Sequence, residues 1–161
     1  MAGIISFGAY IPVYRLDRKL LIIGQGYELK RLKRIAGKNI EFLGWVPDDE
    51  LRGYLSRARA FVFPAIEDFG IVVVEAQACG RPVIVSCLGG AKEAVVEGTT
   101  GLIFNEQSPE AIIEAVRRLE KLEFDPYEIR KNAFRFDKKV FDKAFRRFIF
   151  DSLAEFERNR K

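Results

Sequence analysis

The sequence predicts an α/β domain in which helices cover both faces of a parallel β-sheet and a helical extension follows. Short apolar runs alternate with segments of helical periodicity from residue 20 onward, which is typical of strands joined by helical crossovers. The apolar runs carry no polar alternation, as expected for strands that are buried on both faces. Beyond residue 124 the helical pattern continues without another strand.

The first strand and helix are predicted over residues 20–36. The run LLII at 20–23 is ended by a Gly-Gln-Gly turn, and this combination indicates a buried strand. Residues 27–36 show helical spacing, with lysines and arginines on a face that we interpret as solvated surface. The face expected to lie on the sheet carries Leu29, Leu32 and Ile35.

A second unit follows. Residues 40–44 form the next predicted strand. Pro47 and the three acids behind it begin a helix, because proline fits the first turn and carboxylates are stabilised near the positive helix end. A third strand is predicted over 60–64. The inner face of the helix between these strands carries Leu51, Tyr54, Leu55 and Ala58.

Residues 69–80 are ambiguous by composition, because the run IVVV has the β-branched residues typical of a strand. The neighbouring runs 60–64 and 82–86 are better strands, however, and parallel neighbours need a crossover between them. We therefore predict a buried helix that begins within 68–70 and ends at Gly80.

The last two predicted strands lie at 82–86 and 101–104, with a short helix between them. Ser108 and Pro109 then open another helix, through a side-chain cap and through proline at the first helical position. The sheet is thus Rossmann-like. The whole chain is predicted as a single domain with C-terminal helices over 125–161.

The last helix carries a broad apolar stripe, for which two placements are open. We expect the stripe to pack on the domain. The alternative is docking to another domain or to a membrane surface, because basic residues lie close to it. The stripe comprises Val140, Phe141, Ala144, Phe145, Phe148, Ile149 and Phe156, and the basic residues are Arg146, Arg147, Arg158, Arg160 and Lys161.

Composition excludes several function classes. The 161 residues carry a net charge of +4, which suits a nucleotide ligand or an ordinary basic surface but is too small to indicate nucleic-acid binding. Two cysteines, Cys79 and Cys87, without any histidine form neither a zinc site nor a histidine-based triad. We expect a cytoplasmic protein without a bound metal or cofactor, since no apolar run approaches the ~20 residues of a membrane helix.

The stretch EDFGIVVVE at 67–75 is the main candidate for chemistry. A helix that begins within it exposes backbone amides able to bind an anion, and Gly70 lets a ligand approach closely. Glu67 precedes the helix and Glu75 lies on its second turn, and each carboxylate can accept two hydrogen bonds from a vicinal diol. This pattern fits a nucleotide-sugar. The alternative is a purely structural role, in which one glutamate is an acidic cap at the helix N-terminus and the other forms a salt bridge.

Gly24 and Gly26 follow a strand and precede a helix, which is the position of a dinucleotide-binding turn. The third glycine of that pattern would stand where Leu29 does, so a simple turn is the better interpretation. Gly24 is kept among the residues expected to bind the ligand.

Residues 18–122 resemble the C-terminal, donor-binding half of the family 4 (group 1) glycosyltransferases, which have the GT-B fold. The matching stretches follow the family's order: RKLLIIGQGYELKRL, NIEFLGWVPDDELRGYLSRA, FVFPAIEDFGIVVVEAQACGRPVIVS, GGAKEAVVEGTTGLIF and SPEAIIEAVRRL. The family's E-x7-E pair falls on Glu67 and Glu75. The resemblance implies a nucleotide-sugar site in which Glu67 contacts donor-sugar hydroxyls at the catalytic centre and Glu75 holds the ribose diol.

The resemblance also implies that backbone amides around Gly70 face the sugar and diphosphate, and that the loop at 44–47 borders the base. Family members retain the anomeric configuration, need no fixed metal and are thought to use the leaving phosphate as internal base, which is compatible with the absence of histidine. The residues expected to line the site are Glu67, Phe69, Gly70, Ile71, Glu75, Gly24, Trp45 and Val46.

Two parts of the family pattern are missing: the acceptor-binding N-terminal domain, and the first strand–helix unit of the donor domain with its Arg and Lys for the diphosphate. Residues 1–17 do not match that unit, and residues 1–16 resemble the start of archaeal-type hydroxymethylglutaryl-CoA synthases. We interpret the chain as a chimera in which GIISFG supplies a replacement first strand. Arg15, Arg18 or Lys19 would have to replace the missing cations, and none is expected in the right place.

The expected function is therefore the donor-binding half of a retaining glycosyltransferase. Alone it should bind a nucleotide-sugar weakly and transfer little sugar, because stabilising cations and a closed cleft are large contributions to such catalysis. A partner chain or acceptor domain would restore transfer. The alternative is a non-catalytic nucleotide or nucleotide-sugar binding module, or an engineered scaffold; nucleic acid is not an expected partner, and membrane contact is at most peripheral.

Overall fold

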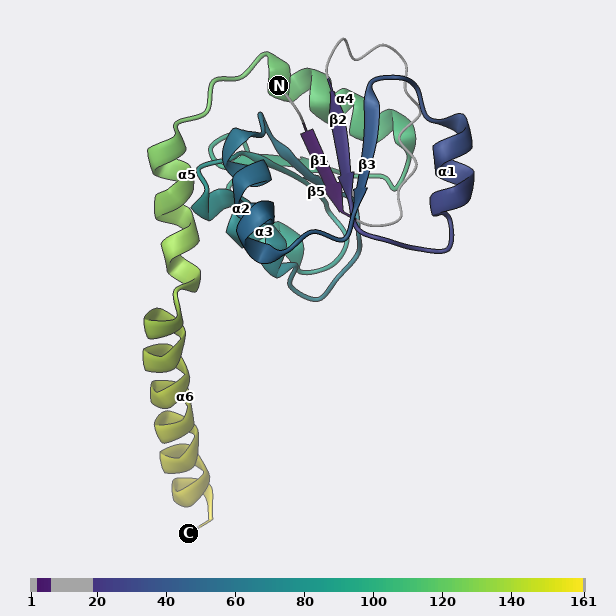
Figure 1. Cartoon of the computed structure of the whole chain (residues 1–161). Coiled ribbons are helices and arrows are strands. Elements are labelled where there is room, and N and C mark those ends of the chain that lie inside the picture. Colours follow the sequence, from purple (N-terminus) through teal and green to yellow (C-terminus); the bar gives the residue numbers. More distant parts are fainter. Residues whose placement is uncertain (1–2, 7–18, 161) are drawn as a thin grey trace.

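The computed structural model describes residues 19–160, together with the backbone of residues 3–6. Most of the synthase-like segment 1–16 therefore lies outside the described residues, as do Arg15 and Arg18. The described chain forms one α/β body from which a long C-terminal helix projects (Figure 1).

The sheet of the described chain has parallel strands in the order β3-β2-β1-β4-β5-β6. The strands are β1 (Gly3–Ser6), β2 (Leu20–Ile23), β3 (Ile40–Gly44), β4 (Phe61–Phe63), β5 (Val83–Ser86) and β6 (Gly101–Phe104). The five predicted strands from residue 20 onward are confirmed to within one residue at each end. The expected strand within GIISFG is present as β1, which pairs with β2 and β4 at the centre of the sheet.

Two apolar cores lie on opposite faces of this sheet, because successive side chains of a strand point to opposite sides. Phe61 and Phe63 join one core and Val62 joins the other. Helices α2 (Asp48–Arg57) and α3 (Ile71–Ala78) contribute to the first core, together with the short 3-10 helix η1 (Ala91–Ala94). Helix α4 (Pro109–Glu120) covers the second. The predicted two-sided cover is confirmed.

Helix α1 (Leu29–Ile35) departs from the prediction, because none of its residues is buried. Ile35, expected on the inner face, is 47% exposed. Figure 1 shows α1 beside the β3 edge of the sheet and separated from it. The reason is the place of β3, an edge strand whose residues are all only half-buried. No strand of the described sheet lies beyond β3 to give α1 a surface to pack on.

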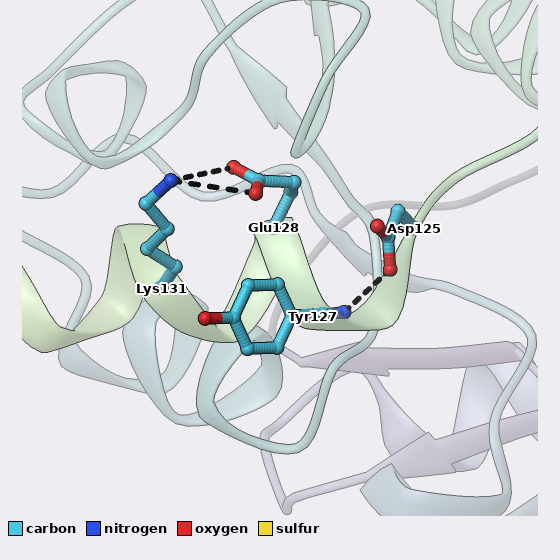
Figure 2. Close-up of polar contacts among 4 residues, drawn as sticks. All are labelled: Asp125, Tyr127, Glu128 and Lys131. Carbon is cyan, nitrogen blue, oxygen red and sulfur yellow. Dashed lines mark hydrogen bonds and ion pairs between the residues drawn. The ribbon is translucent and has the colours of Figure 1, made fainter.

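Helix α5 (Pro126–Ala133) begins with the side chain of Asp125, whose Oδ1 accepts a hydrogen bond of 2.8 Å from the Tyr127 amide (Figure 2). Its outer face carries an ion pair between Lys131 and Glu128. Its inner face fastens α5 to α3, since the buried Asn132 amide donates to Gln77 Oε1 at 2.6 Å and to the carbonyl oxygen of Ala94 at 2.8 Å. The buried side chains of Asn132 and Gln77 thus both have hydrogen-bond partners, as buried polar groups require.

The final helix contradicts the expected packing of its apolar stripe on the domain. A 3-10 turn, η2 (Phe134–Phe136), leads into α6 (Lys138–Asn159), and no residue of α6 is buried. Figure 1 shows α6 pointing away from the sheet with the C-terminus at its far end. The stripe predicted at 140–156 is real, but in one copy of the described chain nothing covers it. None of the described helices is long and apolar enough to cross a membrane.

Candidate functional site

The strand order marks one point at the centre of the sheet. The chain runs outward from β1 through β2 to β3 on one side, and from β4 through β5 to β6 on the other. The order thus reverses between β1 and β4. Ligands of open α/β sheets bind at such a reversal, outside the carboxyl ends of the strands. The segment that follows β4 at this point is 64–70, which contains Glu67.

The structure confirms that IVVV is helical, since α3 spans Ile71–Ala78. Gly70 is the residue before the helix and has φ 72°, a left-handed conformation that favours glycine. A Cβ at this position would also lie 3.1 Å from the Phe63 ring and 3.2 Å from the Ala91 Cβ. The residue before the helix makes no side-chain cap, and the Val73 amide donates to the Gly70 carbonyl oxygen at 2.9 Å. The amides of Ile71 and Val72 are therefore the first-turn donors that a ligand could use.

Glu67 is exposed in the loop before α3, and its backbone is held by the turn at Gly89 and Gly90, which the sequence analysis did not select. The Gly90 amide donates to the Glu67 carbonyl oxygen at 2.8 Å. A Cβ on Gly90 would overlap the Asp68 carbonyl, and one on Gly89 would come within 2.6 Å of the Glu67 carbonyl oxygen. The sequence contained a signal for this turn: the Gly89–Gly90 pair follows the end of β5, so it lies at the same edge of the sheet as Glu67.

Glu75 lies on the second turn of α3 with its side chain exposed on the side of α2. Partial desolvation raises the pKa of the Glu75 carboxyl, the charge of Asp48 raises it further, and the charge of Arg52 opposes both. Asp48 and Arg52 belong to α2. They are neighbours of the candidate site that sequence reasoning did not select, since nothing local relates residue 48 to residue 75.

The remaining predicted residues also follow carboxyl ends of strands. The Gly24 amide donates to the Gly44 carbonyl oxygen at 2.7 Å, which ties together the ends of β2 and β3. Trp45 is 72% exposed and Val46 is half-buried. The loop that contains them leads directly into the first turn of α2, where Asp48 faces Glu75. The structure therefore gathers Gly24, Trp45 and Val46 at the edge that carries the two glutamates.

Phe136, which lies in η2 near the C-terminal end of the described chain, also contacts this edge of the sheet. The Phe69 ring packs edge-on against Phe136 of η2, with ring centroids 5.5 Å apart. The Arg135 guanidinium lies 5.3 Å from the centroid of the same Phe136 ring and donates to Asn132 Oδ1 at 2.9 Å. Residues 134–136 thus support the Phe69 ring. The two partners are more than sixty positions apart in the sequence, so no local sequence pattern predicts this contact.

Lys19, one of three cations considered for a diphosphate, lies at the wrong edge. It directly precedes β2 and forms an ion pair with Glu41 near the start of β3. In a parallel sheet all strands begin at one edge and end at the other. Lys19 therefore lies at the edge opposite the candidate site. The expectation that Lys19 does not replace the missing cations holds.

The arrangement can bind a ligand that combines an anion with diols. Uncapped amides at the start of α3 are donors for an anion, and the exposed carboxylates of Glu67 and Glu75 accept hydrogen bonds from hydroxyl groups. The two carboxylates flank the helix start on its loop side and on its second turn. Carboxylates in those places repel a bare polyanion, which favours a ligand whose hydroxyls reach them.

Comparisons with known proteins place the chain in a family. Residues 12–136 match the model of the glycosyl transferases group 1 family. A GDP-mannose-dependent monoacylated alpha-(1-6)-phosphatidylinositol monomannoside mannosyltransferase of Corynebacterium glutamicum is 38% identical over 116 residues, covering 65% of this chain and 30% of that protein. The chain spans less than half of the length of the curated relatives that it matches first.

Solved structures support the fold. The apo form of the lipopolysaccharide outer core galactosyltransferase WaaB superposes with a TM-score of 0.78 at 15% identity, over 94% of this chain and 49% of that one. Anabaena HepE, solved in complex with UDP and glucose, gives a TM-score of 0.60 at 21% identity, over 95% of this chain and 48% of that one. Both are similar in fold to the whole described body.

Proposed function

Because the chain belongs to the group 1 glycosyltransferase family, we propose that it is the donor-binding half of a retaining glycosyltransferase that uses a nucleotide-sugar. The observation that carries this proposal is the uncapped start of α3 between two exposed glutamates, at the point where the strand order reverses. The names of two similar proteins agree with it, since one depends on GDP-mannose and another was solved with UDP and glucose.

In this proposal the ligand lies across the start of α3. The amides of Phe69, Gly70 and Ile71 face the diphosphate and the sugar, where the helix dipole stabilises negative charge. Glu67 binds hydroxyls of the donor sugar. Glu75 accepts both hydroxyls of the ribose, and the loop with Trp45 borders the base. The Gly89–Gly90 turn is the positioning element that fixes the backbone of Glu67.

Transfer would break the bond between the anomeric carbon and the diphosphate oxygen and form a bond between that carbon and an acceptor oxygen. The acceptor proton would pass to the departing phosphate, which serves as the base. Configuration would be retained, and no metal ion is required by this scheme. Glu67 would orient the sugar, and the α3 amides would stabilise the charge that develops on the leaving group.

The chain alone should bind better than it transfers. Lys19 is at the opposite sheet edge and paired with Glu41, and no acceptor-binding domain covers the carboxyl edge of the described sheet to exclude water. An acceptor domain from elsewhere in the protein or from a partner chain would supply the acceptor and close the cleft. A cytoplasmic location fits this donor chemistry and the two free cysteines, Cys79 and Cys87.

A titration of the purified chain with UDP, GDP and ADP, and with their glucose and mannose conjugates, tests the proposal by calorimetry. We expect saturable binding of one nucleotide series, with affinity lost in Glu75→Ala because the ribose diol loses its acceptor. Glu41→Ala is the matched control, since Glu41 lies at the amino edge. Binding by none of the nine compounds from a folded chain would refute a donor site and leave a family fold without ligand.

A further inference from the structure

Gln107 is a polar side chain that connects three strand ends and has no role in the donor site proposed above. It lies three residues beyond the end of β6. Its Nε2 atom donates to the Pro64 carbonyl oxygen at 2.7 Å and to Ser86 Oγ at 3.4 Å. Pro64 directly follows β4, and Ser86 is the last residue of β5. One side chain thus joins the carboxyl ends of β4, β5 and β6, which are neighbours in the sheet.

The contact between Gln107 and Pro64 is chemically specific. A carbonyl oxygen only accepts hydrogen bonds, so the Gln107 amide must present its nitrogen and not its oxygen. The distance of 2.7 Å lies at the short end of the range for N–H···O bonds. Pro64 is buried, and a buried carbonyl oxygen that loses its donor carries a desolvation cost. The start of the segment that follows β4 is therefore fastened by Gln107.

Ser86 links this contact to the turn that holds Glu67. Its Oγ atom also accepts a hydrogen bond of 3.1 Å from the Leu88 amide. Leu88 leads into the Gly89–Gly90 turn, in which the second glycine donates its amide to the Glu67 carbonyl oxygen at 2.8 Å. The segment that carries Glu67 is thus held at its start by Gln107 and in its middle by the glycine turn, and Ser86 connects the two supports.

We propose that Gln107 is a positioning residue for Glu67, and that it determines how strongly the site prefers a sugar-bearing nucleotide to the bare nucleotide. This inference rests on the proposed function, in which Glu67 binds hydroxyls of the donor sugar. Gln107 acts through the backbone: by fixing Pro64, three residues before Glu67, it limits the positions that the Glu67 carboxylate can adopt. A carboxylate that is already held in place loses less conformational entropy when it binds the sugar, so the complex is stronger.

The groups proposed for the diphosphate and the ribose are held independently of Gln107. They lie at the start of α3 and within it, and this helix is anchored by its buried Gln77. The Gln77 side chain donates to the Ala94 carbonyl oxygen at 2.8 Å and accepts from Asn132 at 2.6 Å. Residues 66–69, by contrast, are exposed, so their segment depends on a few contacts and opens more easily than a packed helix. Loss of Gln107 should therefore weaken sugar binding and leave nucleotide binding unchanged.

The first test is calorimetry of the full chain with UDP, GDP and ADP and with their glucose and mannose conjugates. Gln107→Met keeps the length of the side chain and removes the amide. It should weaken binding of the preferred nucleotide-sugar about fivefold, the effect of one ordinary hydrogen bond, and leave the Kd of the matching nucleotide within a factor of about two. Equal weakening of both ligands would overturn the proposal, because Gln107 would then support the whole domain.

Arg118→Met is the matched control. Arg118 is also exposed, and its Nη2 atom donates to Glu97 Oε1 at 2.9 Å. Glu97 pairs with Gly101 at the start of β6, so this contact lies at the amino edge of the sheet. Arg118→Met should leave the Kd of both ligands within a factor of about two.

A double-mutant cycle tests whether Gln107 acts through Glu67. Residues that act through one another have non-additive effects. Glu67→Ala removes the carboxylate, so adding Gln107→Met to it should cause no further loss of nucleotide-sugar affinity. A further fivefold loss in the double variant would overturn the positioning role and show that Gln107 reaches the ligand by another route.

Amide hydrogen exchange of the Gly90 N–H tests the same support without any ligand, because its acceptor is the Glu67 carbonyl oxygen. Gln107→Met should speed this exchange about fivefold as the segment opens more often, and Arg118→Met should not change it. Unchanged exchange in Gln107→Met would overturn the support itself. If wild type bound none of the nine compounds, the proposed function and the selectivity assigned to Gln107 would both fail, whereas faster exchange would still show that Gln107 holds the segment.

Discussion

Helices α3 and α6 are both rich in apolar residues, yet they have opposite surroundings. Helix α3 is only eight residues long and buries Val73, Ala76 and Gln77 between the sheet and α5. Helix α6 has 22 residues, five of them phenylalanine, and buries none. The difference shows that apolar content alone does not decide burial. A helix is buried where the fold brings it against other elements, as it brings α3 against α5, β4 and β5, whereas the described residues leave every residue of α6 unburied.

The largest effect should come from Gly90→Ala, at the turn that holds the loop before α3. A Cβ there overlaps the Asp68 carbonyl, so the loop must move and the Glu67 backbone loses its partner. We expect a loss of about 3 kcal/mol in the free energy of unfolding and a fall in donor affinity of tenfold or more. Urea unfolding and calorimetry measure both.

Gly26→Ala is its control, because a Cβ at Gly26 meets nothing within 4 Å. It should change stability by less than about 0.5 kcal/mol. Equal effects of the two substitutions would show that the tight approach of the two loops has no energetic weight.

The comparison itself is tested by truncating one residue in each helix. Val73→Ala removes two methyl groups from a side chain that is 0% exposed and should cost about 2 kcal/mol through lost burial and a cavity. Phe148→Ala removes a whole ring from α6 but should cost less than about 0.5 kcal/mol in the dilute monomer. Urea unfolding at low chain concentration measures the pair, and a larger loss for Phe148→Ala would mean that α6 packs on its own domain.

Glu75→Gln should have opposite effects on the stability of the domain and on its affinity for the donor. The pKa of Glu75 is raised in the fold by partial desolvation and by Asp48, so at neutral pH its charge lowers stability, and that cost is relieved as pH falls through the raised pKa. The variant should therefore be equal to or slightly more stable than wild type near neutral pH, with the difference vanishing below the unfolded pKa of about 4.3.

The same variant should lose donor affinity, because a neutral amide is a weaker acceptor for the ribose diol than a carboxylate. Wild-type affinity should fall with decreasing pH at a higher pH than an ordinary glutamate would give. An unaltered affinity in Glu75→Gln, measured by calorimetry, would exclude Glu75 as the diol acceptor.

The smallest effect belongs to Arg147→Ala on α6. Its guanidinium lies 3.5 Å from the Asp151 carboxylate, and both side chains are more than two-thirds exposed, so solvent screens the pair. Unfolding of the dilute monomer should change by less than about 0.5 kcal/mol. A larger loss in thermal unfolding would show that Arg147 makes a contact within one copy that the isolated helix does not explain.

Most of the fold was predictable because it depends on local patterns. The order of strands and helices followed from apolar runs and crossovers, and even the helical state of IVVV followed from the need to connect two better strands. Gly70 and two glutamates eight positions apart likewise indicated a helix start, which the structure has at Ile71. These features arise within a few residues of one another, where spacing determines which groups share a face.

What could not be predicted depends on residues distant in sequence. The support of Glu67 by Gly90, the Phe136 ring against Phe69, and the charges of Asp48 and Arg52 near Glu75 all join separate elements. The outward position of α1 depends on β3 being an edge strand. Each contact arises from the order of strands in the sheet, which periodicity along the chain does not encode.

The amino-acid sequence by itself determined the class of fold, the helical state of the segment that carries the candidate site and the amphipathic character of α6, because propensity and spacing act over a few residues. Only the tertiary structure decided which glycine turn backs Glu67, which charges perturb Glu75 and whether the stripe of α6 has a surface to cover it. The physical reason is that burial is a property of the assembled sheet: a side chain loses its water only where another part of the chain is brought to meet it.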